Sequence, residues 1–307
     1  MTIPASSPPF APLGQAASPL KIGAKGAGLE VWMQRVLERV EKVHPDWNPE
    51  DIHGLRVALR RCRTMAEVLS EVNPSPHWNK VKKSSRDLFQ AMGDLRDTQV
   101  RRQWLKKLGA RGEPLSIIAR PELARREKSL RKNAETALES FDCKSWRKAM
   151  RKLSGKAIFF PLESVVFQRL ALSKLNEAVA LFQEARKKRT SAAWHRLRIG
   201  LKQFRYTVEN FLPQRYEVWS TDLRAMQDLL GDVHDLDMLR SEIRRHASKV
   251  DSAVIAEWRE KIARERKARL QEFLSKATGP DSPWIVWRAG FHLAHPLTLS
   301  PARRKTA

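Results

Sequence analysis

The stretches HGLRVALRRCR, residues 53–63, and HRLRIGLKQFR, residues 195–205, decide the fold expected for this chain of 307 residues. Both begin with a histidine and repeat the same order of apolar and basic residues, 142 positions apart. On a helix that turns about 100° per residue, each stretch separates into an apolar stripe and a basic strip beside it. Each stretch therefore predicts an amphipathic helix that buries one face and presents positive charge next to it.

The basic strip is about 80° wide on the helical projection. It consists of His53, Arg56, Arg60 and Arg63 in the first stretch, and of His195, Arg198, Lys202 and Arg205 in the second. Solvated helix faces usually mix charges of both signs, and like charges four residues apart repel each other. The strip therefore needs neutralisation, for which the candidates are a bound polyanion and the carboxylates of Asp97 and Asp235.

A second pair of motifs follows the basic stretches. MGDLRDTQV at 92–100 matches LGDVHDLDM at 230–238, and Arg86 and Arg224 stand seven residues before the two glycines. We interpret Asp94 and Asp232 as N-caps of new helices that begin after a glycine turn, at 94–108 and 232–248. The repeats span about 29–145 and 160–277. They predict an all-α fold of two four-helix bundles related by internal pseudo-two-fold symmetry.

The two ends of the chain differ from the repeats in composition. Residues 1–28 predict a flexible leader rich in Pro, Ala and Ser, without the features of a secretory signal. Residues 278–307 predict a basic, loosely ordered tail, in which Trp284, Ile285, Trp287 and Phe291 could dock on the body. The chain has no run of 18 apolar residues, so no membrane span is expected and the protein is expected to be cytoplasmic.

The charge of the chain points to polyanions as partners. It has 58 Lys and Arg against 34 Asp and Glu, a formal net charge of +24. Such an excess opposes compaction and attracts nucleic acid, anionic lipid or inorganic polyphosphate. The two cysteines, Cys62 and Cys143, do not have the spacing of metal ligands. No metal or cofactor is expected.

The two motifs together resemble those of the CHAD family, the conserved histidine α-helical domain, over residues 29–277. The matching stretches are HGLRVALRRCR with MGDLRD and HRLRIGLKQFRY with MQDLLGDVHDLD. The resemblance implies two four-helix bundles, binding of inorganic polyphosphate in a basic channel, and association with polyphosphate granules and their proteins. It points to the eight residues of the two basic strips, with Arg61, Arg86 and Arg224 as additions. From the repeat itself, we expect Asp97 and Asp235 to be supporting carboxylates that favour the helix N-terminus or orient arginines. The absence of a triphosphate tunnel motif before residue 29 predicts a stand-alone member.

Nucleic-acid binding is the main alternative function. Backbone phosphates would use the same arginines. Binders of single strands usually add aromatic stacking platforms, for which Tyr206 is the best candidate here. No helix-turn-helix or RNP-type motif is evident, so nucleic acid is the less favoured partner.

An enzyme and a membrane-surface protein are two further alternatives. The sequence VHDLD holds His234, Asp235 and Asp237, a pattern found in metal-binding HD pairs. The first repeat has Arg96, Asp97 and Gln99 there, so the shared aspartate does not need a histidine beside it, and no enzymatic activity is expected. Attachment to a membrane surface is disfavoured because the bundle cores use the apolar stripes that lipid would need.

Overall fold

The computed structural model describes residues 29–43, 47–72, 74–110, 112–157 and 162–291. All regular secondary structure in these ranges is helical, which confirms the all-α prediction. The helices are α1 (Leu29–Val43), α2 (Pro49–Val72), α3 (Pro76–Ser84), α4 (Arg86–Leu108), α5 (Pro114–Glu139), α6 (Cys143–Ala157), α7 (Val165–Lys188), α8 (Ser191–Phe211), α9 (Pro213–Arg245), α10 (Ser252–Ala277) and α11 (Pro283–Ala289). The predicted leader, residues 1–28, lies outside the described residues.

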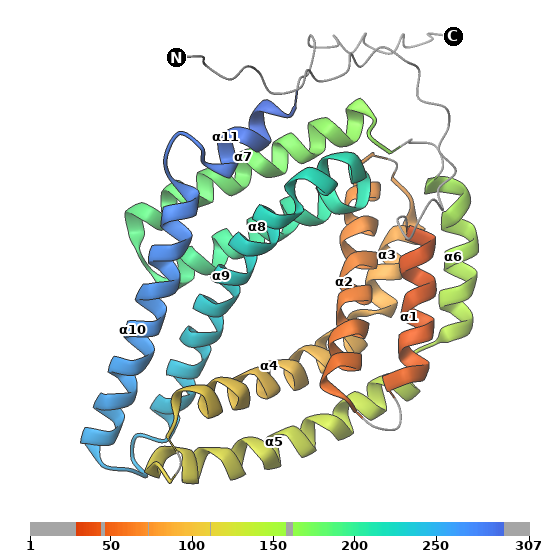
Figure 1. Ribbon diagram of the computed structural model, residues 1–307. Coiled ribbons are helices and arrows are strands. Elements are labelled where there is room, and N and C mark those ends of the chain that lie inside the picture. The colour runs from red at the N-terminus through yellow and green to blue at the C-terminus, as the bar shows by residue number, and fades with distance from the viewer. Residues whose placement is uncertain (1–28, 44–46, 73, 111, 158–161, 292–307) are drawn as a thin grey trace, which may run out of the picture.

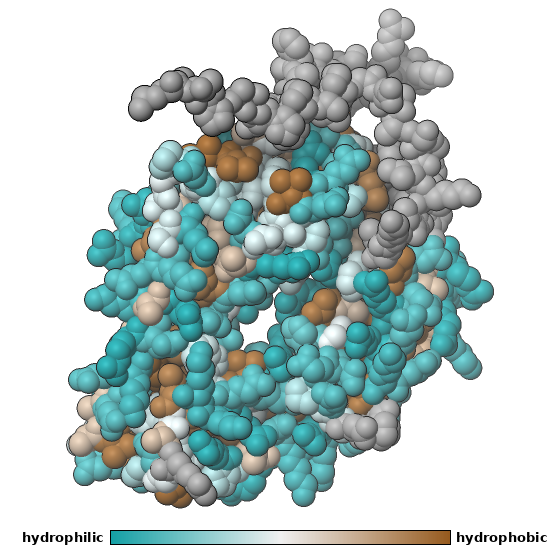
Figure 2. Space-filling model, viewed as in Figure 1, coloured by the Kyte–Doolittle hydropathy of each residue, from teal (hydrophilic) through white to brown (hydrophobic). Residues whose placement is uncertain are grey.

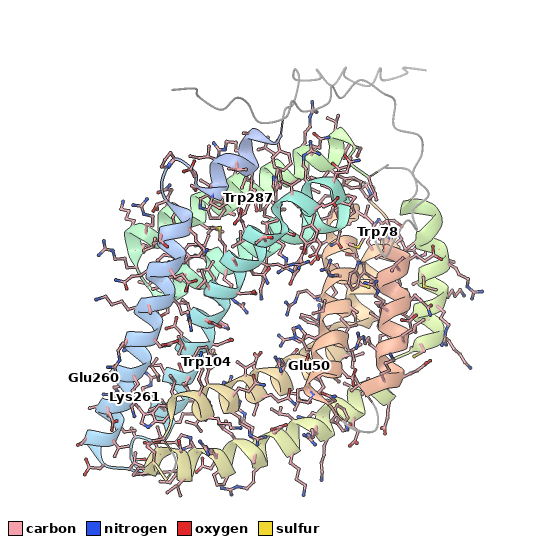
Figure 3. The ribbon with its side chains drawn as sticks, viewed as in Figure 1. Glu50, Trp78, Trp104, Glu260, Lys261 and Trp287 are labelled. Carbon is pink, nitrogen blue, oxygen red and sulfur yellow. The ribbon has the colours of Figure 1, made fainter. Side chains whose placement is uncertain are left out.

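The first half forms a bundle of α1, α2, α3 and α6, from which α4 and α5 extend as a helical hairpin (Figure 1). The apolar stripe of the first motif is buried in this bundle, where Leu55, Leu59 and Cys62 have no exposed surface. Trp78 of α3 lies fully buried in the same bundle (Figure 3). The basic strip of α2 is thereby turned away from the bundle core.

The second half repeats the contacts of the first. Helix α8 packs on α7 as α2 packs on α1, and α10 packs on α9 as α5 packs on α4. Helix α11 contacts α7, as α6 contacts α1. An internal duplication produces matched contacts of this kind, and the pseudo-two-fold relation itself stays a prediction.

Contacts between equivalent helices join the two halves: α2 meets α8, α4 meets α9, and α5 meets α10. A separate apolar core forms where the two hairpins meet, around Trp104 of α4 and Trp258 of α10. The chain thus closes into a ring. Figure 2 shows an opening through its middle, edged mainly by hydrophilic residues, and Figure 1 shows α2, α4, α8 and α9 around it.

The predicted helix breaks at the two glycines are wrong. Gly93 lies inside α4 and Gly231 inside the continuous helix α9, so Asp94 and Asp232 are not N-caps. Neither glycine has the positive φ of a turn; among the glycines that the structure describes, only Gly112 and Gly279 do. A glycine inside a helix costs only about 1 kcal/mol. Buried apolar residues before and after each glycine hold the helices together.

The prediction of a loosely ordered tail is wrong for residues 278–291. This segment forms α11, and Trp284, Trp287 and Phe291 are buried against the body. Trp287 packs on Phe204 of α8, with ring centroids 5.4 Å apart. Ile285 remains exposed. Residues 292–307, the rest of the predicted tail, lie outside the described residues.

Among the described helices, none has the length and apolarity needed to cross a bilayer.

Candidate functional site

Four basic side chains from two helices meet at the contact between the two halves. They are Arg56 and Arg60 of α2, and Arg198 and Lys202 of α8, which together we call the central cluster. Burial lowers the pKa of both Arg198 and Lys202, and the nearby charge of Arg60 acts in the same direction on each. Helices α2 and α8 cross beside these residues, where Arg60 donates a hydrogen bond to the hydroxyl of Tyr206 at 3.0 Å. The crossing joins the two predicted strips into one basic surface.

Each motif aspartate approaches the arginine of its own half. Arg56 Nη1 donates to Asp97 Oδ1 at 3.1 Å and to the carbonyl of Gly93 at 3.4 Å. The charge of Asp235 acts on Arg198 in the second half, opposing the decrease in pKa that burial causes there. Asp97 lies within α4 and Asp235 within α9, and each places a carboxylate near the arginine of its own half.

Lys202 and Arg198 have too little opposite charge around them. Neither makes a hydrogen bond or ion pair with any residue in the described part of the chain. Burial, followed by the charges of Arg60, Arg198 and Arg56, lowers the pKa of Lys202 to about 6. A half-buried lysine with such surroundings gains most from an anion that enters beside it.

The pKa of Asp235 is also shifted from its ordinary value. Burial raises its pKa to about 6, and the neighbouring Asp97 and Asp232 act in the same direction against Arg198. Below this pH the cluster therefore loses a negative charge.

The histidines of the two halves have different neighbours. His195 Nδ1 lies 3.2 Å from His234 Nδ1. His53 keeps an exposed surface, but the part of its ring that is shielded from water, and then the charge of Arg96, lower its pKa. Burial, Arg198 and His195 lower the pKa of His234 to about 4. The motif reasoning identified neither His234 nor Arg96 as a site residue. Their equivalent positions, directly before each motif aspartate, are the signal that could have identified them.

The remaining predicted cations lie away from the cluster or are already paired. Arg61 is buried, pairs with Glu209 and donates to Asn210 at 3.2 Å, so it joins α2 to α8. Arg63 donates to the carbonyl of Lys82 and to Ser85 Oγ at the end of α3. Arg205 faces Glu209 at 3.6 Å.

Arg86 and Arg224 are exposed, and each stands eleven residues before the motif aspartate of its own helix. That separation is about 16 Å along a helix. Arg224 donates instead to the hydroxyl of Tyr216 at 3.1 Å. The structure does not bring these two arginines to the central cluster.

The residues behind the alternative functions are engaged in other contacts. Tyr206 is buried and accepts the hydrogen bond of Arg60, so it is not an exposed stacking platform. Asp237 receives two hydrogen bonds from Arg266, at 2.8 and 3.2 Å, while His234 faces His195. Within the described ranges, no group of three or more His, Cys, Asp or Glu is placed to hold a metal ion.

The duplicated fold and the basic cluster between its halves define a class of helical protein built around a cationic centre. A family model, the CHAD domain, matches residues 29–244, and the chain belongs to this family. Its fold is similar to the crystal structure of the CHAD domain from the plant Ricinus communis. That comparison has a TM-score of 0.53 and 18% sequence identity, and covers 87% of this chain and 90% of that chain. No curated protein matches the sequence.

Proposed function

We propose that the chain binds inorganic polyphosphate at the central cluster. The observation that carries the proposal is the set of four basic side chains where α2 and α8 meet, of which Arg198 and Lys202 have no partner among the described residues. Arginine binds phosphate oxygens through its planar fork, and lysine binds them as a point charge. A row of phosphates supplies the negative charge that the cluster lacks.

The arrangement favours an extended anion over a single phosphate. Arg56 and Arg60 are one turn apart on α2, as are Arg198 and Lys202 on α8, so the cluster spans about 6 Å on each helix. Several phosphates can contact it at once. Binding then releases counterions, and affinity falls steeply with salt concentration.

The surroundings of the cluster favour polyphosphate over nucleic acid. Phe89 lies 5.8 and 5.9 Å from the guanidinium carbons of Arg56 and Arg60, and Tyr206 is buried. Both aromatic rings are therefore engaged by arginines, and base stacking gains nothing from them. We further propose that the chain is a binding protein and not an enzyme, and that polyphosphate brings it to cytoplasmic polyphosphate granules.

A competition titration tests the proposal. Labelled long-chain polyphosphate is bound to the protein and displaced by unlabelled polyphosphate, single-stranded DNA or duplex DNA, at two salt concentrations. We expect DNA to need on the order of tenfold more phosphate than polyphosphate for equal displacement. Equal displacement at equal phosphate concentration contradicts the choice of polyphosphate. Release of phosphate on addition of divalent metal contradicts the absence of enzymatic activity.

A further inference from the structure

A second basic pocket adjoins the central cluster where α8 begins, between α9 and α10. Its volume is about 520 Å³, and we call it the α8–α10 pocket. Arg240 and Arg244 of α9 and Arg259 of α10 line it, together with His195 and His234. His195 stands one helical turn before Arg198 on α8, and His234 lies beside His195, so the pocket reaches the edge of the central cluster.

The positive charge of this pocket is not neutralised from within. In the described part of the chain, Arg240, Arg244 and Arg259 make no ion pair or side-chain hydrogen bond. Asp237, the one carboxylate in the lining, is held by Arg266 through two hydrogen bonds. Helix α8 has no acidic residue in its first turn, so its N-terminus adds a favourable field for an anion.

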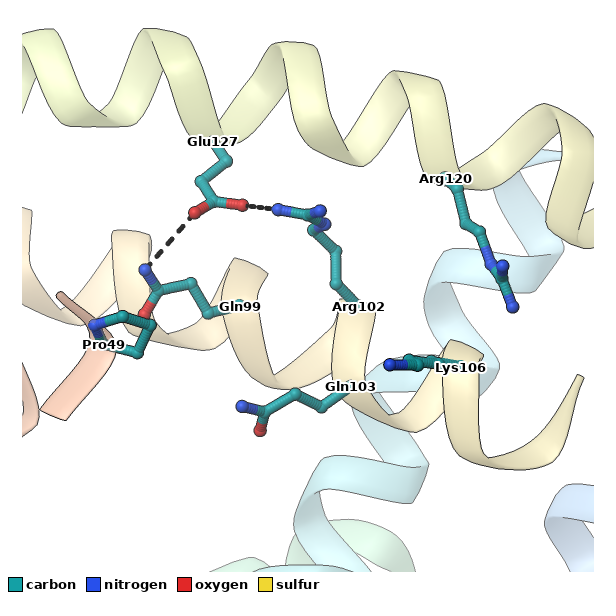
Figure 4. Close-up of a pocket in the computed structure, with 7 residues that line it drawn as sticks. All are labelled: Pro49, Gln99, Arg102, Gln103, Lys106, Arg120 and Glu127. Carbon is teal, nitrogen blue, oxygen red and sulfur yellow. Dashed lines mark hydrogen bonds and ion pairs between the residues drawn. The ribbon is translucent and has the colours of Figure 1, made fainter. Parts of the chain in front are cut away.

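The first half holds an equivalent pocket between α4 and α5, which we call the α4–α5 pocket (Figure 4). Four of its residues on α4 lie 138 positions before residues of the α8–α10 pocket: Gln99 and Asp237, Arg102 and Arg240, Gln103 and Ser241, Lys106 and Arg244. Arg120 of α5 stands 139 positions before Arg259 of α10, and Pro49 stands 142 before Ser191. The duplication has therefore produced two copies of one pocket.

The linings of the two copies have equal formal charge but differ in how that charge is paired. Glu127 of α5 is buried in the α4–α5 pocket, where it accepts hydrogen bonds from Arg102 and Gln99 (Figure 4). Its counterpart 139 positions later is Arg266, which lies outside the lining of the α8–α10 pocket and binds Asp237. Helix α2 also has two acidic residues in its first turn. The α4–α5 pocket is smaller, at about 300 Å³, and its carboxylate pairs with Arg102 of the same lining, whereas the carboxylate of the α8–α10 pocket is held by Arg266 from outside the lining.

The copies differ also in their connection to the centre. The two histidines belong to the lining of the α8–α10 pocket, while their counterparts His53 and Arg96 are not in the lining of the other. An anion chain that leaves the central cluster past His195 and His234 therefore meets three unpaired arginines. No such continuous track of lining residues leads into the α4–α5 pocket.

We propose that the α8–α10 pocket is a second phosphate subsite, which extends the central cluster on one side, while its duplicate in the first half is not used. The inference rests on the proposed binding of polyphosphate. It predicts that a long chain is held asymmetrically, across the central cluster and outward between α9 and α10. Short oligophosphates, which the central cluster can hold alone, do not need the second pocket.

Equivalent positions provide a matched pair of variants. Arg244→Glu with Arg259→Glu changes the α8–α10 pocket, and Lys106→Glu with Arg120→Glu makes the same charge change in its duplicate. All four side chains are exposed, so neither variant disturbs a core. Affinity for long-chain polyphosphate and for tripolyphosphate is measured for both variants and the wild type over a range of salt concentrations.

We expect R244E/R259E to weaken binding of the long chain on the order of tenfold more than K106E/R120E does. The affinity of R244E/R259E for the long chain should depend less steeply on salt concentration, by about the contribution of two phosphate contacts. Its affinity for tripolyphosphate should change no more than in the control variant. Equal losses in the two variants, or no loss in R244E/R259E, overturn the inference and leave the central site standing. A wild-type protein that binds neither polyphosphate contradicts the proposed function, and the inference with it.

Discussion

At the scale of single residues, the two halves of the central cluster carry different kinds of charge. The first half offers Arg56 and Arg60, while the second has Lys202 at the position of Arg60 and His234 at that of Arg96. Arginine stays charged throughout the physiological range, whereas lysine loses its proton readily when buried. In the duplicated site, the charge of the first half is therefore permanent, whereas the charge of the second half changes with pH.

This difference predicts that binding takes up protons. The free protein holds Lys202 at a pKa of about 6, and a phosphate chain beside it stabilises the ammonium and raises that pKa. The complex then binds more protons than the free protein above pH 6, so affinity falls as the pH rises from there. Asp235, with a pKa raised to about 6, contributes with the same sign because an anion raises its pKa further.

Calorimetry in phosphate-free buffers of different ionisation enthalpy measures this uptake. We expect wild-type protein to take up protons on binding near neutral pH, and Lys202→Arg to take up close to one fewer while retaining affinity. Binding of wild type without any proton exchange contradicts this assignment.

The contacts of Arg61 could not be predicted from the sequence. Helical spacing alone puts it outside the strip of His53, Arg56 and Arg60, and only the family resemblance added it to the site. The structure buries it against Glu209 and Asn210, partners 148 and 149 positions away that no local pattern could supply. Contacts of this kind depend on how the two motif helices cross, which the sequence does not reveal.

We therefore expect Arg61 to act in stability rather than in binding. Arg61→Ala leaves the buried carboxylate of Glu209 with only the more distant Arg205, and should destabilise the protein by about 3 kcal/mol. Denaturant unfolding measures the loss, and the affinity of the folded variant for polyphosphate should change less than threefold, about 0.6 kcal/mol. A large loss of affinity with unchanged stability would return Arg61 to the site.

At the scale of helices, periodicity predicted the motif stretch of α2 correctly, whereas the expected glycine turn divided α9 in two. The apolar spacing of the first motif continues toward both ends of α2, where Ile52 and Leu69 are buried. In α9 the Gly-Asp pair has the local features of a turn, and buried Leu230 and Val233 on either side of it override them. Tertiary packing thus keeps α9 continuous at a position where the local sequence favours a turn.

The two glycines of α8 and α9 should respond oppositely to alanine. A Cβ at Gly231 meets no atom within 4 Å, so Gly231→Ala should stabilise the protein by about 0.5–1 kcal/mol. A Cβ at Gly200 would lie 2.7 Å from Leu181 Cδ1 and 3.6 Å from Ala178 Cα, where α7 and α8 pack closely. Gly200→Ala should cost about 1–3 kcal/mol. Denaturant titrations of both variants check the two signs, and a destabilised Gly231→Ala contradicts the continuous helix.

At the scale of the whole molecule, a buried ion network helps to close the ring. Glu242 of α9 lies 3.7 Å from Arg101 of α4 and 3.8 Å from Arg126 of α5, and His246 lies 3.5 Å from it. These contacts cross from one half to the other beside the second apolar core. The sequence predicted two bundles and their basic strips, but not the ring, because the contacts that close it join residues more than 100 positions apart.

Removal of Glu242 should therefore weaken the contact between the two halves that closes the ring. Glu242→Ala leaves several buried or half-buried cations without their carboxylate, and should destabilise the protein by about 3–5 kcal/mol. Exposed Glu217 at the other end of α9 is the matched control, and Glu217→Ala should change stability by less than about 0.5 kcal/mol. Equal effects of the two substitutions on thermal unfolding would contradict the closing role of the network.

The central claim is that polyphosphate binds where the two motif helices cross. The most direct test compares the affinity of two double variants with equal changes of charge for long-chain polyphosphate. Arg56→Glu with Arg198→Glu changes the central cluster, and Arg86→Glu with Arg224→Glu changes equivalent exposed positions outside it. Circular dichroism checks that both variants are folded, and Lys202→Glu serves as a second central variant. We predict that R56E/R198E and Lys202→Glu lose at least about 100-fold and tenfold in affinity, while R86E/R224E loses only a few-fold. Equal losses in the two folded double variants, or no loss from R56E/R198E, would contradict the account.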